Sequence, residues 1–111
     1  KVLCWHHALP EMNHNELVGW AGGKKEYAVI VFRNEDDFYR TQVRMDITKE
    51  VASQKTDVYI EVYSKGTSRT ERSLYLIALG DWVSVYLADL NNVDPVEVTV
   101  ISHLKGKLAK L

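Results

Sequence analysis

The sequence predicts an α/β fold, a three-layer sandwich in which a parallel sheet lies between helices. Two strand-forming runs, residues 27–32 and 57–63, are each followed by a stretch with helical signals. The first run is apolar throughout, which is typical of a strand covered on both faces, as in a parallel sheet. Strands that alternate with helices also favour a parallel sheet with crossover helices. We therefore expect the order βα-βα-βα-α within one domain.

The chain is expected to begin with a strand, a polar loop and a short helix. Residues 2–7 are apolar and aromatic, as in a short buried strand. Asn13 offers a side-chain cap, and Glu16 follows at the spacing of a capping box. The sequence therefore predicts a helix over residues 14–21 that ends at a pair of glycines.

Three further helices are expected along the chain, over residues 35–53, 69–90 and 96–110. The helix over residues 69–90 is apolar around most of its circumference, so it is buried or lies between the core and a partner. Gly80 in its middle costs about 1 kcal/mol relative to alanine. Close approach of another backbone would explain why this position tolerates glycine.

Composition and charge exclude several classes of function. The net charge of −1 gives no excess of basic residues for nucleic acid or an anionic membrane. The single cysteine, Cys4, rules out an internal disulfide and fits a reducing, cytoplasmic compartment. No apolar run approaches the roughly 20 residues of a membrane span. The first residue is not methionine and no signal-peptide layout follows it, so we expect a fragment of a longer protein.

His14 is the first candidate for chemistry, because it occupies the first position of the predicted helix. The helix dipole there disfavours the imidazolium, and a neutral histidine near pH 7 can act as acid or base. Alternatively, His14 hydrogen-bonds the loop or packs under Trp20. Glu11 and Glu16 are the neighbouring carboxylates, although Glu16 is more simply explained as the capping-box partner.

Lys105 is the second candidate. On a helical wheel it falls between Val98 and Ile101, at the edge of the apolar arc of the last helix. A lysine in this place either extends its ammonium to water or offers a partly desolvated ammonium to an anionic ligand. Both interpretations are open on these residues alone.

Metal and nucleotide sites have little support in the sequence. His6 and His7 are adjacent on the predicted strand, so their side chains point to opposite faces. A site that combines one of them with His14 and Glu11 stays open, but no metal-ligand spacing is present. Residues 65–68 either bind an anion or cap the helix that follows. The sequence therefore predicts neither a bound metal nor a cofactor.

Three stretches resemble the bacterial and archaeal phosphoglucose/phosphomannose isomerases that are built from two sugar isomerase (SIS) domains. Residues 9–20, LPEMNHNELVGW, resemble the signature of that family. Residues 79–88 with 93–95, and then residues 101–105, follow in the order of its C-terminal domain. The resemblance spans nearly the whole chain. It implies that residues 1–111 are a partial C-terminal SIS domain, truncated at its N-terminal side.

The resemblance also implies an activity and roles for two residues. The family interconverts glucose 6-phosphate and fructose 6-phosphate through a cis-enediol, without a cofactor. The histidine of its Asn-His-Asn-Glu motif assists ring opening and serves the neighbouring subunit of a homodimer, a role that falls on His14. A lysine near the C-terminus contacts the substrate oxygens, and Lys105 is the matching position. A sugar phosphate and a second subunit are thus the implied partners.

Two departures from the family bear on activity. The proton-transferring glutamate and the loop that holds the phosphate match no residue in the chain, so we expect the isolated chain to be inactive. Residues 94–97 read Asp-Pro-Val-Glu where the family more usually has Asp-Pro-Thr-Pro, which leaves mannose 6-phosphate open as a substrate. The alternatives are a regulatory SIS module that binds a sugar phosphate without chemistry, and a purely structural dimerisation half.

Overall fold

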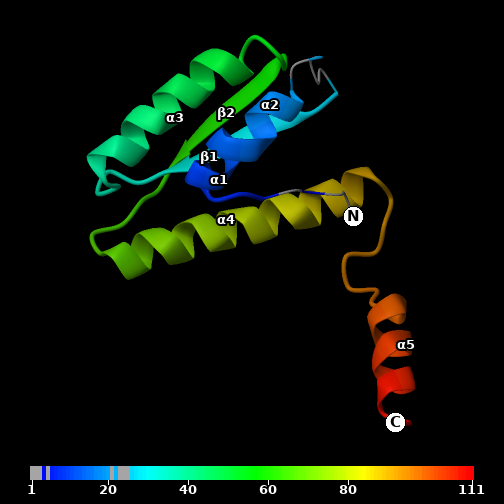
Figure 1. Cartoon of the computed structure of the whole chain (residues 1–111). Coiled ribbons are helices and arrows are strands. Elements are labelled where there is room, and N and C mark those ends of the chain that lie inside the picture. Colours follow the sequence, from blue (N-terminus) through cyan, green and yellow to red (C-terminus); the bar gives the residue numbers. More distant parts are fainter. Residues whose placement is uncertain (1–3, 5, 21, 23–25) are drawn as a thin grey trace. The chain divides into compact units, whose positions relative to one another are not determined.

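A computed structural model describes residues 4, 6–20, 22 and 26–111, with the backbone alone at residues 14 and 15. The chain forms two compact units, one over residues 4–78 and one that includes residues 79–111. The elements, shown in Figure 1, are α1 (Leu9–Glu11), η1 (Met12–Glu16), α2 (Leu17–Gly19), β1 (Ala28–Arg33), α3 (Tyr39–Ala52), β2 (Val58–Tyr63), α4 (Arg69–Leu90) and α5 (Thr99–Leu108).

The two described strands form the parallel sheet that the sequence predicts. They pair in register from Ala28 opposite Val58 to Arg33 opposite Tyr63, and α3 is the crossover between them. Thr56 fixes where the two strands begin. Its buried hydroxyl donates to the carbonyl oxygen of Tyr27 and accepts the Val58 amide at 3.2 Å. The α/β class and the parallel pairing are therefore confirmed.

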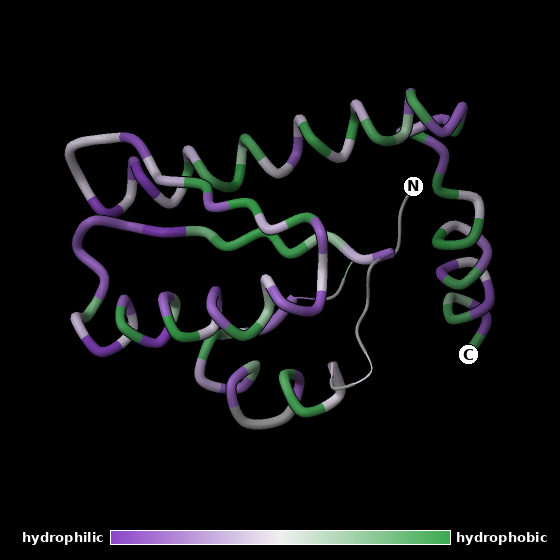
Figure 2. Tube along the Cα trace, turned by 90° about the horizontal axis from the view of Figure 1, so that it is seen from above, coloured by the Kyte–Doolittle hydropathy of each residue, from purple (hydrophilic) through white to green (hydrophobic). Residues whose placement is uncertain are grey.

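The core of this unit lies on one side of the sheet. Val29 and Val31 of β1 pack with Met45 and Ala52 of α3, all of them buried. The N-terminal helical segment lies on the same side as α3 (Figure 2), and its contribution to the core includes Leu9 and Trp20.

The opposite side of β1 is exposed, contrary to the expectation of a strand covered on both faces. Ile30 is 52% exposed and Phe32 is 45% exposed, and their neighbour Ile60 on β2 is 44% exposed. The reason is that α3 and the N-terminal segment cover the same side.

The beginning of the chain differs most from its prediction. Cys4, His6 and His7 have no regular secondary structure, and residues 2, 3 and 5 of the predicted strand lie outside the described residues. The helix begins at Leu9 and not after Asn13, because Pro10 fits the first helical turn, where its missing amide hydrogen leaves no bond unmade. The capping box predicted at Asn13 and Glu16 is therefore wrong. The helix ends at Gly19, and Ala21 lies outside the described residues.

The helix after β1 starts at Tyr39, four residues later than predicted. The reason is a local turn, in which the amide of Asn34 donates to Asp37 Oδ2 at 3.0 Å. Gln42 then closes the first turn of α3, with its side-chain amide donating to the Asp37 carbonyl oxygen at 2.7 Å. The Asp37 carboxylate thus accepts a hydrogen bond within this turn, and α3 begins only after it.

The bounds of α4 are those predicted, and both ends have recognisable caps. At its start Ser68 Oγ accepts the Glu71 amide at 3.1 Å, and the Glu71 carboxylate accepts the amides of Thr67 and Ser68. At its end Asn92 adopts a left-handed conformation with φ of 52°, and the Val93 amide donates to the Ala88 carbonyl oxygen at 2.9 Å. Residues 65–68 thus cap the helix.

The surface of α4 within the chain is mostly exposed. Leu76 and Ala88 are the buried apolar residues that the structure describes on it, whereas Trp82 and Tyr86 are 61% and 62% exposed. Among the described helices, α4 alone has the length and hydropathy of a membrane span, contrary to the expectation that no apolar run is long enough. Core helices of globular proteins share this length and composition, so α4 is equally suited to lie between the core and a partner.

Candidate functional site

The Asn-His-Asn-Glu motif lies in a π-helical segment. Residues 9–19 form one continuous helix, which widens to π-helical hydrogen bonding over η1 (Met12–Glu16). Single π-helical turns occur frequently at functional sites. His14 is therefore in the interior of a helix and not at its start, so the helix dipole gives no reason to expect a neutral imidazole, contrary to the prediction.

Two side-chain contacts hold this segment. On its buried side Asn13 Nδ2 donates to Thr48 Oγ1 of α3 at 2.6 Å. On its more exposed side Glu16 Oε1 lies 3.7 Å from His7 Nε2. Glu16 is thus a partner of His7 and not the capping residue that the sequence predicts. The motif is anchored to α3 on one side and to the preceding chain on the other.

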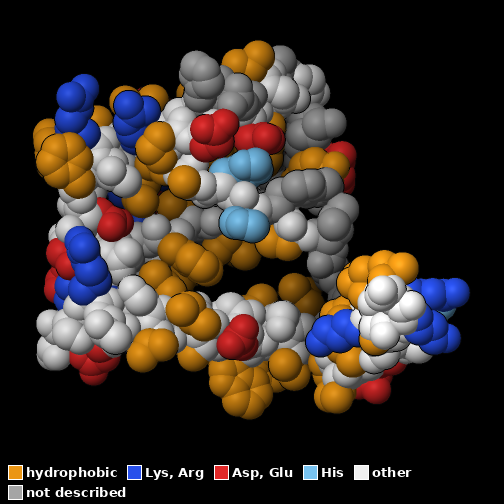
Figure 3. Space-filling model, turned by 60° about the horizontal axis from the view of Figure 1, so that its bottom comes forward, with side chains coloured by type: hydrophobic (Ala, Val, Ile, Leu, Met, Phe, Trp, Pro, Cys, Tyr) orange, Lys and Arg blue, Asp and Glu red, His pale blue; other side chains and the backbone are white. Residues whose placement is uncertain are grey.

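Lys105 lies on α5, in the unit that includes residues 79–111. The predicted apolar arc around it exists, but Ile101, Leu104 and Leu108 are each more than half exposed. Figure 3 shows hydrophobic and basic side chains together on this helix, at the lower right. Lys105 therefore has the amphipathic surroundings that the sequence predicts. His14 belongs to the other unit.

Arg72 joins the two loops that follow the strands. It is buried, and its Nη2 donates to Asp36 Oδ2 at 2.6 Å while Nη1 lies 3.3 Å from Glu35 Oε1. Nη1 also donates to the carbonyl oxygen of Gly66 at 3.3 Å. The hydrogen bond from Arg72 lowers the pKa of Asp36. Ligands often bind at the carboxyl edge of a parallel sheet. At this edge Arg72 is already paired with carboxylates of the chain itself.

The loop before α4 is occupied by a carboxylate of the chain itself. The amide and the hydroxyl of Thr67 donate to Glu71 Oε2 at 2.6 and 2.9 Å, and these hydrogen bonds lower the pKa of Glu71. Gly66 has φ of 135°, and a Cβ there would lie 2.7 Å from Glu71 Cγ. Of the two interpretations of residues 65–68, the structure favours helix capping over anion binding.

A second charge cluster stabilises the middle of the first unit. Arg33 is buried on β1, and its guanidinium lies 2.7 Å from Asp46 Oδ1 and 2.5 Å from Glu61 Oε1. The Lys49 ammonium pairs with the other oxygen of Glu61. The hydrogen bond from Lys49 lowers the pKa of Glu61, and the charge of Arg33 acts in the same direction. This cluster links α3 to both strands.

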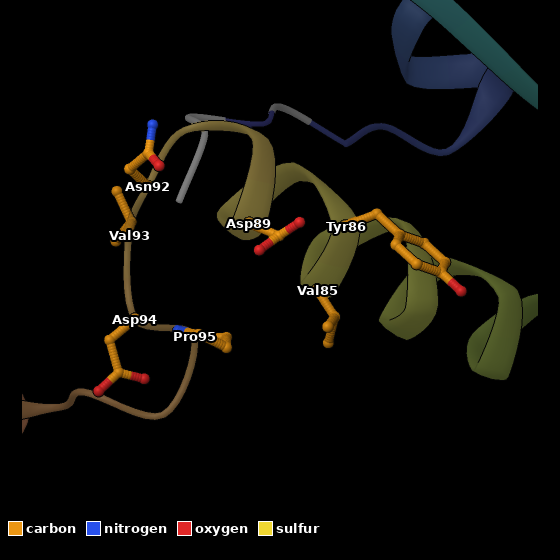
Figure 4. A pocket seen from close by; sticks show the side chains of 7 residues that line it. All are labelled: Val85, Tyr86, Asp89, Asn92, Val93, Asp94 and Pro95. Atoms are coloured by element: carbon orange, nitrogen blue, oxygen red, sulfur yellow. The ribbon is translucent and has the colours of Figure 1, made fainter.

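A shallow pocket of about 440 Å³ lies in the second unit, between the end of α4 and the segment that follows it. Val85 and Pro95 face this space (Figure 4). Its lining residues are Val85, Tyr86, Asp89, Asn92, Val93, Asp94 and Pro95. The lining has two carboxylates and no basic side chain, so the pocket does not suit a phosphate group.

The metal site that would combine His6 or His7 with His14 and Glu11 lies partly outside the described side chains, because the side chain of His14 is not described. Among the described residues, no group of three or more His, Cys, Asp or Glu side chains is arranged to hold a metal ion. Cys4 is exposed and is not part of a buried strand.

A family model described as the bacterial phospho-glucose isomerase C-terminal SIS domain matches residues 1–108. The chain belongs to this family. The bifunctional phosphoglucose/phosphomannose isomerase of Aquifex aeolicus is 41% identical over 104 residues, which are 92% of this chain and 32% of that protein. Proteins of the same name from Caldicellulosiruptor bescii and Thermoplasma volcanium are 38% and 32% identical, over 100% and 98% of this chain.

This SIS domain spans about a third of the length of the curated relatives that it matches. No solved structure matches it significantly. The family match confirms the resemblance that residues 9–20 and the two later stretches indicate.

Two residues that organise this SIS domain escaped the sequence analysis, namely Thr48 and Arg72. Their partners lie far away in the sequence, at Asn13 and Asp36. A signal for Thr48 existed, since it occupies the same face of α3 as Met45 and Ala52, where an aliphatic residue is usual. Arg72 carries no comparable signal, because an arginine in the first turn of an exposed helix is ordinary.

Proposed function

We propose that this SIS domain is part of an aldose–ketose isomerase that interconverts glucose 6-phosphate and fructose 6-phosphate. The family match over residues 1–108 carries the proposal. The relatives are named as bifunctional phosphoglucose/phosphomannose isomerases, so we extend the proposal to mannose 6-phosphate as a second substrate. Val96 stands where the family more usually has threonine, so the activity on mannose 6-phosphate is tested separately.

The proposed reaction moves hydrogen from one carbon of the sugar to the next. The sugar ring opens, a proton leaves C2 and returns to C1, and the intermediate is a cis-enediol. The C1 carbonyl becomes a hydroxyl while the C2 hydroxyl becomes a carbonyl, so no external oxidant, reductant or cofactor is needed. The demands on the protein are therefore proton transfer at the ring oxygen and at carbon, and stabilisation of the negative charge on the enediolate.

His14 is the residue to which we assign ring opening. Opening requires a proton at the ring oxygen and loss of one from the C1 hydroxyl, and an imidazole can do both near neutral pH. The support is its place in the motif that the resemblance identifies and the π-helical turn that carries it. In the family this histidine serves the neighbouring subunit, and we propose the same arrangement here.

Lys105 is the residue to which we assign contact with the substrate oxygens. An ammonium beside the developing enediolate stabilises its negative charge in the transition state. The support is the matching position in the family, together with the amphipathic surroundings of Lys105 on α5.

We also propose a homodimer and a cytoplasmic location. On α4, Trp82 and Tyr86 stack with ring centroids 5.9 Å apart, although both rings are mostly exposed. A stacked aromatic pair of this kind is typical of the centre of a protein interface. We therefore interpret the apolar surface of α4 as a contact with protein and not with lipid.

The proposed function is tested on the full-length natural protein that contains these residues. The activity is measured with glucose 6-phosphate and mannose 6-phosphate as substrates and fructose 6-phosphate as the product. Lys105→Met should lower kcat by roughly 10²-fold, the scale of one lost transition-state contact. Lys107→Met is the matched control, because Lys107 lies two residues away on the same helix and is exposed. Equal effects of the two substitutions would contradict the role of Lys105.

His14→Ala is measured on ring-closed glucose 6-phosphate and on the fraction already in the open-chain form. A role in ring opening predicts a loss of roughly 10²–10⁴-fold on the closed form and a much smaller loss on the open form. His103→Ala on α5 is the control. Saturable hexose phosphate binding without turnover in the natural protein would instead indicate a regulatory SIS module. The 111-residue chain alone is expected to show no turnover.

A further inference from the structure

The hydrogen bond between Asn13 and Thr48 is the point at which the motif helix is fixed to α3. It joins residues 35 positions apart, and its donor and acceptor atoms, Asn13 Nδ2 and Thr48 Oγ1, are 2.6 Å apart. Thr48 is the largest fully buried side chain that the structure describes, with 0% exposure. Asn13 directly precedes His14 in the chain.

A threonine is unusual at this position of α3. The buried residues of the helix are Met45, Thr48 and Ala52, and the first and third belong to the apolar core. A buried hydroxyl loses its hydrogen bonds to water, so it lowers stability unless a partner replaces them. Valine has nearly the same shape and no such requirement. The Asn13 amide supplies the partner, and this contact explains why a polar side chain occupies the core.

The segment held by this bond needs support from outside itself. A π-helical turn has poorer internal geometry than an α-helix and persists where its surroundings stabilise it. Here the turn is Met12–Glu16, and Asn13 is its second residue. The contact on the other side, between Glu16 and His7, is longer at 3.7 Å and more exposed, so it is the weaker of the two. The bond to Thr48 is therefore the main anchor of the turn.

We propose that Thr48 is a positioning residue, which holds the π-helical turn through Asn13 and thereby places His14 for ring opening. The role of Thr48 in ring opening rests on the proposed function. The placement of His14 does not, because it is a property of the folded protein with or without activity.

The experiment compares Thr48→Val with Thr48→Ser in the natural protein. The valine variant keeps the shape and removes the hydroxyl, whereas the serine variant keeps the hydroxyl. Thr41→Val is the matched control, because Thr41 lies on the same helix and is only partly buried. The first readout is the NMR resonance of the His14 ring in protein labelled at histidine, with the resonance of His103 as an internal reference.

We expect Thr48→Val to shift the His14 resonance, and Thr48→Ser and Thr41→Val to leave it in place. The effect should disappear in an Asn13→Ala background, because the bond is already absent there. A His14 resonance that does not move in folded Thr48→Val protein would overturn the proposal. So would a shift of the same size in the Asn13→Ala background. If Thr48→Val does not fold, Thr48→Ala takes its place, because it also removes the hydroxyl that accepts from Asn13. A His14 resonance that stays in place in folded Thr48→Ala protein would then overturn the proposal.

The second readout is kinetic and separates this proposal from the proposed function. Thr48→Val should lower kcat on ring-closed substrate by roughly 10- to 100-fold, the scale of a small misplacement of a catalytic group. KM and the rate on the open-chain form should stay nearly unchanged. A general loss of folded protein would instead lower the rate on both forms of the substrate. If the natural protein has no isomerase activity, the proposed function fails, and the NMR readout still decides whether Thr48 positions His14.

Discussion

Arg72 and Asp36 form a 2.6 Å hydrogen-bonded ion pair that joins the first turn of α4 to the loop after β1. The arginine side chain is 9% exposed, and the carboxylate side chain is 38% exposed. Because the same arginine also contacts the loop after β2, through the carbonyl oxygen of Gly66, the pair holds three chain segments together. This one guanidinium therefore links α4 to the loops that follow both strands.

Arg72→Met should therefore destabilise the domain by about 2 kcal/mol, the scale of a few hydrogen bonds to charged groups discounted for exposed partners. The matched control is Arg69→Met, because Arg69 is 82% exposed and lies 3.7 Å from Asp36. It should change the free energy of unfolding by less than about 0.5 kcal/mol. Urea denaturation measures both. Similar losses in the two variants would mean that the buried contacts of Arg72 contribute little.

The lowered pKa values of three carboxylates predict how the free energy of unfolding depends on pH. The pKa values of Asp36, Glu61 and Glu71 are all lowered in the folded protein, by hydrogen bonds from Arg72, Lys49 and the Thr67 amide respectively. A lowered folded pKa gives stability that is present above the unfolded value, about 4, and is lost as the pH falls through the folded value. The free energy of unfolding should thus decrease from about pH 4 downwards.

Equilibrium unfolding at a series of pH values between about 7 and 2.5 measures this dependence. Glu61→Gln should be less stable than wild type at pH 7, and its stability should fall less steeply below about pH 4. Glu50→Gln on the exposed side of α3 is the control, and its profile should parallel that of wild type. A wild-type profile that stays flat down to about pH 3 would show that the three interactions do not stabilise the fold.

Two glycines should respond in opposite directions to substitution by alanine. Gly66→Ala should lower stability by about 1–3 kcal/mol, because φ of 135° is strained for any L side chain and the new Cβ meets Glu71. Gly80→Ala in α4 should raise the stability of the chain by about 1 kcal/mol, since no described atom lies within 4 Å of its Cβ position. Thermal unfolding of both variants tests this, and destabilisation by Gly80→Ala would contradict it.

Gly80 also distinguishes folding from association. Close approach of another backbone would explain a glycine at this position, and the described part of the chain provides no such backbone. If a second subunit makes this approach, Gly80→Ala should weaken dimerisation of the natural protein while it stabilises the monomer. Sedimentation velocity over a range of protein concentrations measures the change. A dimer of unchanged affinity would place the interface elsewhere.

The aromatic pair on α4 gives a direct test of the proposed dimer. Trp82→Glu should shift the natural protein towards monomer by at least about 10-fold in the dissociation constant, because it places a charge in an apolar interface. Val100→Glu on α5 is the control, since Val100 is 81% exposed and lies outside α4. Binding of the wild-type protein to lipid vesicles, lost in Trp82→Glu, would instead indicate a membrane contact.

Elements with a continuous run of apolar residues were the easiest to predict. The strands β1 and β2 lie within one residue of the predicted runs, and α4 has the predicted bounds. The N-terminal segment was harder, because Pro10 is compatible both with a loop and with the first turn of a helix. Asn13 and Glu16 have the spacing of a capping box, but the helix had already begun at Leu9. Local spacing alone does not distinguish these two arrangements.

The sequence by itself determined the α/β class, the parallel order of the strands and the family, through its apolar runs and the motif of residues 9–20. It also singled out His14 and Lys105 as candidates. Only the tertiary structure decided that the motif is a π-helical turn anchored on Thr48, and that Arg72 links the loops after β1 and β2. The physical reason is that hydrophobic periodicity acts over neighbouring residues, whereas these hydrogen bonds join residues more than thirty positions apart.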